Sequence, residues 1–473
     1  MWNSPFLLLH LLLVVSVVVV IIAENRSSYK ALSWIIVVSF LPILGGLLYL
    51  MFGRDVRLKG YLRNPIYRDI TEAPKRLSCV AQCSSEILED SLYIPLMNLL
   101  EADNESVLLN ASDIQIYPSG KEKFAALFSD LERAQHHIHL EYYIVTNDDL
   151  GKSLLSLLVR KARSGIQVRV LYDAFGSKGV GSRFWHPLKE AGGEVCGFNP
   201  LLFPYLGVQI NSRNHRKIVV IDGNVGYVGG MNVALRYLKG NELGAWRDSH
   251  FRIQGTAVAG LQRAFLRDWN YTARKKLFSS RYFPCESEPC VTIPMQFSTN
   301  GPVGRACTIE RAITRAVALA KEHIYIETPY FLPTDILLNA IMSAALRGVR
   351  VCLMLPERGD SLLTTKASNS YLSQVLLLGV EVYLYRAGFL HSKLLTIDGK
   401  LSSIGSSNMD FRSLELNYEI NAFVYDKTTT QRIEELFAQD LENCTRLEYS
   451  SWQQRGKAQR FFESLFRLLA PML

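Results

Sequence analysis

The feature that most constrains the fold of this chain is an internal duplication. Residues 134–173 and 320–356 both run as a short apolar strand, an amphipathic helix, a glycine and a second apolar strand. A helix that connects two strands favours parallel pairing and an α/β architecture. Two copies in 473 residues predict two large domains rather than a solenoid of many small repeats. We therefore expect two duplicated α/β domains packed about a pseudo-two-fold axis.

Both copies lead into the same polar motif, H-x-K-x4-D-x6-G-[GS]-x-N. Its polar residues are His215, Lys217, Asp222 and Asn232 in the first copy and His391, Lys393, Asp398 and Asn408 in the second. One H-x-K-x4-D could arise by chance in a chain with nine histidines. Two copies at matching places in a duplication are not expected by chance, so this motif predicts where the chemistry lies.

The spacing within each motif indicates which side chains share a face. The histidine and the lysine are two residues apart, so on a strand both leave the same face of the sheet. The aspartate has the opposite parity and precedes a glycine, which is the signature of a tight turn. We place all three in the candidate catalytic set, but expect Asp222 and Asp398 to have a structural or salt-bridging role. The Gly/Ser-rich step should bring backbone N–H groups and the amides of Asn232 and Asn408 to the same pocket, as donors for a phosphate.

Two histidines that face each other across a pseudo-dyad suit phosphoryl transfer. One imidazole, held neutral, would attack phosphorus, while the other, protonated, would donate to the leaving alkoxide and then deprotonate the incoming alcohol. Each needs an orienting acid at its second ring nitrogen, and the candidates are Asp248 and Glu419, which follow the two motifs and each stand just before an apolar strand. The lysines neutralise the phosphate oxygens, so we expect neither metal nor cofactor. Glu141 and Glu327 also match between the copies, with a buried turn-bonding role and a site role equally open.

The N-terminal part is strongly apolar. The runs Phe6–Ala23 and Ala31–Phe52 are each close to the ~20 residues that cross a bilayer core as a helix. Residues 1–5 carry no charged side chain, which argues against a signal peptide. We therefore expect a transmembrane helical hairpin, and the basic residues that follow it should keep the rest of the chain in the cytoplasm. The net charge of +8 favours an anionic partner, and the hairpin favours lipid over nucleic acid.

These observations predict five parts of the chain. The C-terminal part is an amphipathic helix that could lie on a membrane or pack against the core, and both readings stay open. The predicted parts are two transmembrane helices (1–53), a basic linker with a small helical region (54–110), a first α/β domain (111–290), a second α/β domain (291–450) and the amphipathic C-terminal helix (451–473).

The two H-x-K-x4-D copies with G-[GS]-x-N resemble the phospholipase D superfamily. The apolar hairpin and the segments Thr328–Pro333 and Asn408–Glu419 narrow the resemblance to bacterial cardiolipin synthases. The resemblance implies two phospholipase D-like domains with the site between them. It also implies that two phosphatidylglycerol molecules give cardiolipin and glycerol through a covalent phosphatidyl-histidine, with His215 as the nucleophile and His391 as the acid/base. The protein would then be a multi-pass protein of the inner (plasma) membrane, with phosphatidylglycerol and anionic membrane, and no nucleic acid, as partners.

Two other functions compete with this hypothesis. A superfamily nuclease or hydrolytic phospholipase D would keep the motifs, but a nuclease has no need of a membrane hairpin and should line its groove with basic and aromatic residues. A non-enzymatic membrane scaffold could keep the duplication, but the intact motifs argue against it. The acceptor stays open, because phosphatidylglycerol, phosphatidylethanolamine and water are all nucleophiles that a similar pocket could admit.

Overall fold

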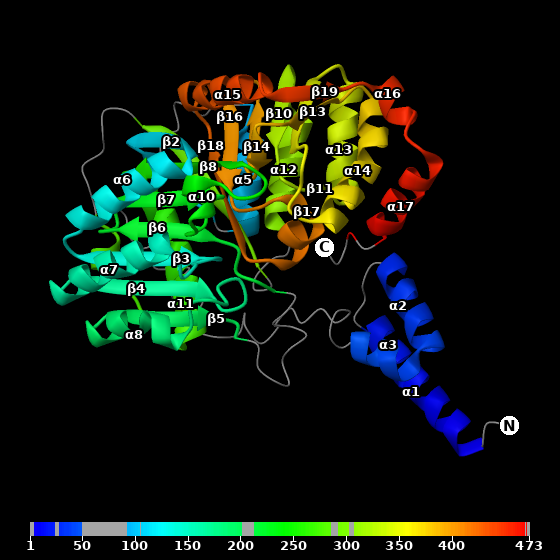
Figure 1. Cartoon of the computed structure of the whole chain (residues 1–473), viewed down its shortest axis with the longest axis horizontal. Coiled ribbons are helices and arrows are strands. Elements are labelled where there is room, and N and C mark those ends of the chain that lie inside the picture. The colour runs from blue at the N-terminus through cyan, green and yellow to red at the C-terminus, as the bar shows by residue number, and fades with distance from the viewer. Residues whose placement is uncertain are drawn as a thin grey trace.

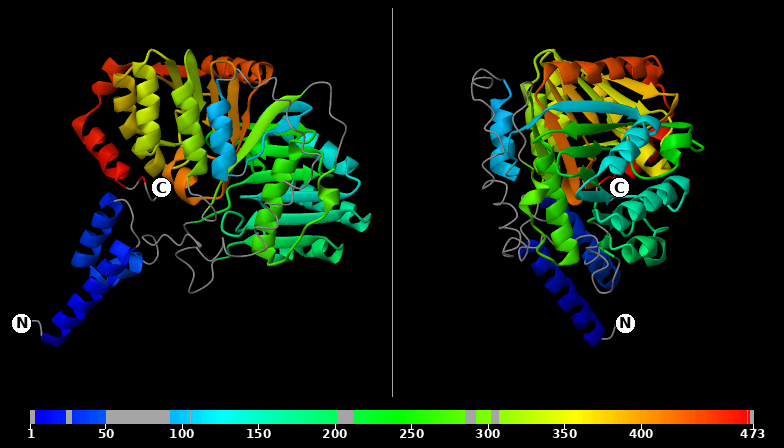
Figure 2. Two further views of the ribbon diagram at one scale, coloured as in Figure 1. Left: turned by 180° about the vertical axis from the view of Figure 1, so that it is seen from behind. Right: turned by 90° about the vertical axis from the view of Figure 1, so that its left-hand side faces the viewer.

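The structure is a computed structural model in which two α/β lobes lie side by side (Figure 1). Two further ribbon views, from behind and from the side, show the same two lobes, with the N-terminal helices projecting from one end (Figure 2). The residues that the structure describes are 4–23, 28–49, 92–104, 106–200, 212–284, 292–301, 307–468 and 470.

The first lobe is built on a sheet with the order β14-β8-β7-β6-β3-β4-β5, in which β2 also pairs with β8. Helices α6, α7 and α8 pack on one face of this sheet, and α11 packs on the other. The strands are β2 (Asp113–Ser119), β3 (His137–Tyr142), β4 (Gln167–Asp173), β5 (Glu194–Phe198), β6 (Lys217–Ile221), β7 (Val225–Gly229) and β8 (Ala245–Gln254). The helices are α6 (Gly120–Arg133), α7 (Asp149–Arg163), α8 (Ser182–Glu190), the short α10 (Arg236–Lys239) and α11 (Val258–Ala273).

The second lobe repeats this plan in a sheet with the order β1-β9-β18-β16-β15-β10-β12-β13-β19. Its strands are β1 (Leu109–Ala111), β9 (Ile293–Asn300), β10 (His323–Glu327), β12 (Arg350–Pro356), β13 (Glu381–Tyr385), β15 (Leu394–Ile397), β16 (Leu401–Gly405), β18 (Glu419–Val424) and β19 (Cys444–Leu447). Its helices are α12 (Thr308–Leu319), α13 (Asp335–Leu346), α14 (Leu362–Leu377) and α15 (Lys427–Leu441). The predicted duplication is confirmed: in each lobe a strand, a helix and a parallel strand precede an antiparallel strand that begins beside the motif.

The lobes are joined by a shared core and by exchanged strands. Apolar residues of β6 and β8, among them Val220 and Phe251, pack in one cluster with Leu394 and Ile420 of the second lobe. The short strand β14 (Gly388–Leu390) belongs to the second half of the chain, yet it pairs in parallel with β8 of the first lobe. Because β14 ends one residue before the second motif, this exchange carries that motif to the boundary between the lobes.

The segment before the first lobe packs on the second lobe instead. Helix α5 (Ile94–Asn104) lies against α12 and β9, and its Leu96 and Leu100 are part of the second lobe's core. Strand β1 then pairs antiparallel with β9 before the chain enters the first lobe. Helix α5 lies within the region 54–110 for which a small helical part was expected, and residues 50–91 lie outside the described part of the chain.

The N-terminal region differs from the predicted pair of membrane-crossing helices. It forms α1 (Ser4–Ala23), α2 (Ser28–Phe40) and α3 (Pro42–Leu48), so the second apolar run is divided in two. Pro42 causes the break, because it has no N–H to donate and it excludes the helical conformation for Leu41, whose φ and ψ are −130° and 69°. Among the helices that the structure describes, none is both long and apolar enough to cross a membrane.

The chain ends in α16 (Tyr449–Gln453) and α17 (Lys457–Arg467), and α17 packs against α14. The outward face of α17 leaves large apolar side chains exposed: Phe461 is 65% exposed and Phe462 54%. Both ribbon views place helices α1–α3 on the side of the body where α17 and the C-terminus lie (Figures 1 and 2).

Candidate active site

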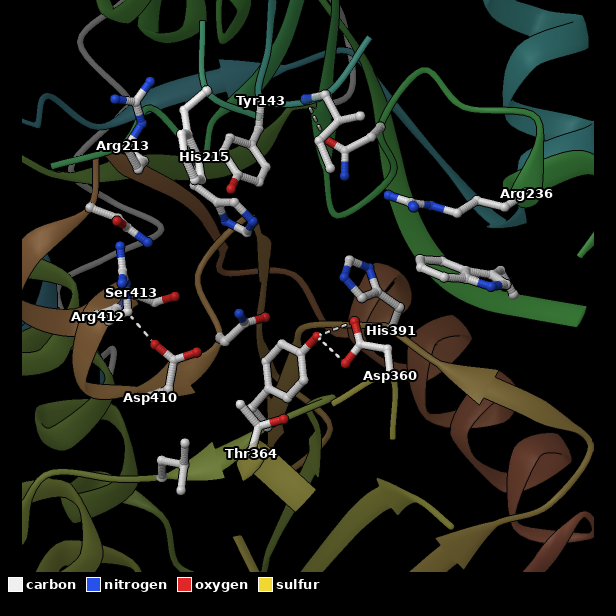
Figure 3. A pocket seen from close by; sticks show the side chains of 18 of the residues that line it. Tyr143, Arg213, His215, Arg236, Asp360, Thr364, His391, Asp410, Arg412 and Ser413 are labelled. Atoms are coloured by element: carbon white, nitrogen blue, oxygen red, sulfur yellow. Dashed lines mark hydrogen bonds between the residues drawn. The ribbon is translucent and has the colours of Figure 1, made fainter. Parts of the chain in front are cut away.

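Both motif histidines line one cavity of about 590 Å³ between the lobes (Figure 3). Both lobes supply basic, aromatic and amide side chains to it, and the acidic lining residues, Asp360 and Asp410, come from the second lobe. Its principal polar and aromatic lining residues are Tyr143, Arg213, His215, Asn232, Arg236, Asn241, Trp246, Tyr330, Asp360, Thr364, His391, Asn408, Asp410, Arg412, Ser413 and Asn417. The pairing of His215 and His391 expected from the duplication is therefore present.

A reciprocal backbone exchange brings the two histidines to this boundary. The N–H of His391 donates to the carbonyl of Arg247 at 2.7 Å, and the N–H of His215 donates to the carbonyl of Tyr418 at 2.9 Å. Each histidine thus pairs with the residue that precedes the predicted orienting acid of the other lobe. The segment before the second motif, β14, is an edge strand of the first lobe's sheet, whereas the segment before the first motif forms a single β-bridge, between Asn214 and Tyr418, next to the start of β18.

The orienting acids consequently act across the lobe boundary. The Nδ1 of His391 lies 2.6 Å from Oδ2 of Asp248, which belongs to the first half of the chain. The Nδ1 of His215 lies 3.1 Å from Oε2 of Glu419, which belongs to the second half. An ionised carboxylate can only accept, so each imidazole donates through Nδ1 and keeps Nε2 for the cavity. Both predicted acids are fully buried beside a histidine, and neither serves the histidine of its own half.

The two lysines lie under the histidines and bring concentrated positive charge to the boundary. Lys217 and Lys393 are buried, and each Nζ donates to the backbone carbonyl of the histidine two residues before it. The Nζ of Lys393 is also 3.0 Å from Nδ1 of His391. Burial lowers the pKa of Lys217 to about 7, with Glu419 opposing the shift and Lys393 adding to it. The positive charges of the two lysines therefore repel each other across the lobe boundary.

Burial also controls the protonation of the imidazoles. It lowers the pKa of His391 to about 3, with Lys393 adding to the effect and Asp248 opposing it. It lowers the pKa of His215 as well, against the opposing charge of Glu419. The pKa of Glu419 falls below its usual value, because His215 and Lys217 outweigh the effect of burial. With no phosphate bound, these pKa shifts favour the neutral form of both imidazoles at pH 7.

Asp222 and Asp398 lie away from the cavity, in equivalent turns. Asp222 accepts hydrogen bonds from the backbone N–H groups of residues 135, 136 and 137 at 2.7–2.9 Å. Asp398 accepts from those of residues 321, 322 and 323 at 2.8–2.9 Å. Each aspartate thus clamps the start of the central strand to the end of the motif strand. This geometry assigns both of them a structural role, as their parity predicted, although we placed them in the catalytic set.

The Gly/Ser-rich steps differ from the prediction. The N–H of Gly230 donates to the carbonyl of Ser249 at 3.0 Å, and the N–H of Ser406 donates to that of Ile420 at 2.9 Å. Both N–H groups are therefore used by the sheet and are not available to a phosphate. The predicted asparagines, Asn232 and Asn408, do line the cavity. The Nδ2 of Asn232 donates to the Tyr237 hydroxyl at 3.2 Å.

Glu141 and Glu327 are buried beneath the site, each beside an arginine of the first half of the chain. Glu141 accepts from Asn214 Nδ2 at 2.5 Å and lies near Arg216, while burial raises its pKa well above the usual value. Burial raises the pKa of Glu327 to about 7, which the nearby Arg247 partly offsets. Neither glutamate lines the cavity. The match between Glu141 and Glu327 in the two sequence copies therefore reflects equivalent buried positions in the two lobes.

The sequence reasoning missed three arginines that line the cavity, Arg213, Arg236 and Arg412, and a repeated pattern marks the last two. Arg236 and Arg412 stand four residues after Asn232 and Asn408, so the duplicated motif extends to G-[GS]-x-N-x3-R. Extending the same register by four residues would have found both. No repeat in the sequence points to Asp360 and Asp410, the acidic residues that line the cavity, because the first half carries no acid at the matching positions.

Comparisons with known proteins agree with this arrangement. The family model described as cardiolipin synthase, PLD-like domain, matches residues 127–269 and 313–441, and the model described as phospholipase D-nuclease N-terminal matches residues 11–54. A cardiolipin synthase of Geobacillus thermodenitrificans (strain NG80-2) is 39% identical over 470 residues, covering 97% of this chain and 92% of that protein. The major cardiolipin synthase of Bacillus subtilis (strain 168) is 36% identical over 483 residues, covering 99% and 98%.

A solved structure supports the fold. The phosphatidylserine synthase of Haemophilus influenzae Rd KW20 superposes with a TM-score of 0.64 at 14% identity, covering 80% of this chain and all of that one. Identity this low supports the shared fold alone. The sequence match over nearly the whole chain and the family models together show that the chain belongs to the cardiolipin synthase family of proteins with two phospholipase D-like domains.

Proposed function

We propose that the protein is a cardiolipin synthase that transfers a phosphatidyl group from one phosphatidylglycerol to the hydroxyl of another and releases glycerol. The observation that carries the proposal is the pair of imidazoles in one cavity, each held at Nδ1 by a carboxylate of the opposite lobe. This arrangement directs both Nε2 atoms to a shared space with two lysines close by. It supplies a nucleophile, an acid/base and charge neutralisation for one phosphorus atom.

The first half-reaction forms a covalent intermediate. Nε2 of His215 attacks phosphorus of the donor lipid, the bond from phosphorus to the glycerol oxygen breaks, and His391 donates its proton to that oxygen. Glycerol leaves, and the phosphatidyl group stays on His215. Lys217, Lys393 and the side-chain amides of Asn232 and Asn408 would stabilise the charge on the non-bridging oxygens.

The second half-reaction regenerates the site. A hydroxyl of the second phosphatidylglycerol attacks the same phosphorus, His391 takes the proton of that hydroxyl, and the bond between phosphorus and Nε2 breaks. Cardiolipin is released, and the proton on His391 restores the starting state. Atoms balance over the cycle: two phosphatidylglycerols give one cardiolipin and one glycerol.

The acid form of His391 requires the substrate. Without an anion, burial and Lys393 keep the pKa of His391 near 3. A bound phosphodiester places a negative charge among the two lysines and the two imidazoles, which favours a proton on the ring that Asp248 holds. We therefore propose that protonation of His391 accompanies substrate binding. The protein then avoids an uncompensated buried imidazolium in its resting state.

We further propose that the N-terminal helices and α17 hold the protein on the plasma membrane, with the catalytic lobes in the cytoplasm. Helices α1–α3 leave apolar side chains exposed, including Val19 at 58% and Phe40 at 82%. Helix α17 exposes Phe461 and Phe462 beside the basic residues Lys457, Arg460 and Arg467, as expected for contact with anionic headgroups. The division of the chain at residues 53, 110, 290 and 450 is part of the same proposal.

The test is a product analysis with the purified full-length protein. Vesicles of phosphatidylglycerol labelled in the headgroup glycerol are incubated with the protein, with and without a chelator. We expect cardiolipin and free labelled glycerol in equal amounts, unchanged by the chelator. Phosphatidic acid as the sole lipid product would identify a hydrolase, and activity that only an added metal restores would contradict the metal-free scheme. Cleavage of nucleic acid without lipid products would identify a nuclease, and no activity at all would favour a scaffold.

A further inference from the structure

Cardiolipin synthesis places a second phosphate in the cavity, and this phosphate takes no part in the chemistry. The acceptor lipid carries its own phosphodiester on the same glycerol that supplies the attacking hydroxyl. In the proposed mechanism Lys217 and Lys393 serve the phosphate that reacts, and the Nζ of each donates to the backbone carbonyl of a motif histidine. A second anion in a partly buried cavity needs a cation of its own, because an unpaired buried charge is costly.

Arg236 is placed to supply that cation. It lines the cavity, and its Nε is buried with no hydrogen-bond partner. Within the described residues Arg236 has no carboxylate partner. Its guanidinium group lies instead over the rings of Tyr237 and Trp246. By contrast, Arg213, which also lines the cavity, donates to the carboxylate of Asp173 at 2.6 Å. The guanidinium of Arg236 therefore keeps its donors for a ligand.

The surroundings of Arg236 place it on the side of the acid/base. Its guanidinium carbon is 4.6 Å from the ring centre of Trp246, and that ring is 5.2 Å from the ring of His391. Trp246 is itself held by a hydrogen bond of 2.9 Å from Nε1 to Asn241 and by an edge contact with Phe389. Figure 3 shows the side chain of Arg236 extending from α10 into the cavity beside His391. The ring of Trp246 thus contacts both Arg236 and His391, the group that deprotonates the acceptor.

From this geometry we infer that Arg236 binds the non-reacting phosphodiester of the acceptor phosphatidylglycerol while His391 deprotonates its terminal hydroxyl. The inference rests on the proposed function, and on His391 as the acid/base. A guanidinium presents a planar pair of donors to two phosphate oxygens, which orients the acceptor as well as attracting it. Arg236 is thereby a specificity-determining residue that favours a phosphate-bearing alcohol over water or a simple alcohol.

The experiment measures how one intermediate is partitioned between two acceptors. Vesicles of phosphatidylglycerol are incubated with the full-length protein in the presence of ethanol, and cardiolipin and phosphatidylethanol are quantified in the same sample. Both products come from the same phosphatidyl-enzyme, so their ratio does not depend on the amount of folded protein or on the donor step. We expect R236Q to lower the ratio of cardiolipin to phosphatidylethanol about tenfold or more, and R236K to lower it less.

The matched control is K239Q, which removes an exposed positive charge from the same short helix, outside the cavity. Its ratio should equal that of the wild-type protein. An unchanged ratio in R236Q would overturn the inference, and so would loss of both products, because the donor step should not require Arg236. An equal fall in K239Q would reduce the effect to general surface charge and would also overturn it. If the wild-type protein forms phosphatidylethanol but no cardiolipin, the proposed function fails instead.

Discussion

The surroundings of the two histidines share a backbone plan but differ in their acids. On the His215 side, the acid is Glu419, and the hydroxyl of Ser406 donates to it. On the His391 side, the acid is Asp248, and the residue equivalent to Ser406 is Gly230. A Cβ atom at Gly230 would lie 2.1 Å from Oδ1 of Asp248, so only glycine leaves room for this carboxylate.

This difference shows that the acid and the small residue vary together. Glutamate is one methylene longer than aspartate, and at the Glu419 side the extra reach is combined with a serine that supplies a hydrogen bond. At the Asp248 side, the shorter acid approaches over a glycine that has no side chain. The structure makes the glycine a steric requirement of one site. The two halves have therefore kept the same backbone exchange while their acid sites have diverged.

The largest expected effect comes from removing each histidine. We expect His215→Ala and His391→Ala each to lower cardiolipin formation about 10³-fold or more. The two variants should differ in covalent labelling: with phosphatidylglycerol that carries ³²P in the phosphatidyl group, and a quench in mildly alkaline detergent that preserves the acid-labile bond between phosphorus and histidine, H391A should retain labelled protein and H215A should not. Labelling of H215A alone would reverse the two roles. Continued cardiolipin formation by both variants would remove the mechanism altogether.

The next effect tests whether the acids act across the lobes. We expect Asp248→Asn and Glu419→Gln each to lower the turnover number about 10²- to 10⁴-fold, because the imidazole loses the partner that fixes its tautomer. Steady-state rates on a phosphodiester with a good leaving group keep the weak variants measurable. In this assay, D248N should lower the rate of the H391A variant little further. By contrast, E419Q should lower the rate of the H391A variant by the same factor as it lowers that of the wild-type protein. Coupling of Asp248 to His215 instead would contradict the exchange between lobes.

An exchange of the two small residues sharpens the comparison. We expect Gly230→Ser to lower activity more than Ser406→Gly, because the first forces a side chain against a buried carboxylate, at about 1–3 kcal/mol, while the second loses one hydrogen bond. Adding Asp248→Glu to G230S recreates the pair found in the other lobe and should restore part of the activity. Rates and melting temperatures of the three variants decide this. A double variant weaker than G230S alone would show that the residues do not form a matched pair.

The smallest effect is a shift in pH dependence. Lys217 has a pKa of about 7 in the absence of substrate, so it loses its charge as the pH rises through that value. We therefore expect kcat/KM, which reports the free protein, to fall about tenfold per unit above pH 7. Lys217→Arg should move this alkaline limb upward, because arginine stays protonated. Lys239→Arg should leave the limb in place, and a limb that K217R does not move would show that another group controls it.

Much of the architecture could be predicted from the sequence, because it rests on local patterns. The strand, helix and glycine order of each copy depends on periodicity, and the turn at Asp222 depends on the Asp-Gly pair that follows β6. Those predictions hold in the structure. The predictions failed where remote contacts decide the outcome, as for the N–H of Gly230, which the neighbouring strand takes up.

The sequence by itself determined that two copies of one motif exist and that Asp248 and Glu419 are equivalent. Only the tertiary structure decided that each acid serves the histidine of the other half. The physical reason is that the backbone before each motif finds its hydrogen-bond partners in the opposite lobe, on β8 for the second motif and at Tyr418, just before β18, for the first. Backbone groups buried at that boundary must be paired, and the pairing places each histidine beside the other lobe's acid. Such a match between remote edges leaves no trace in local spacing, so it emerges only when the lobes pack.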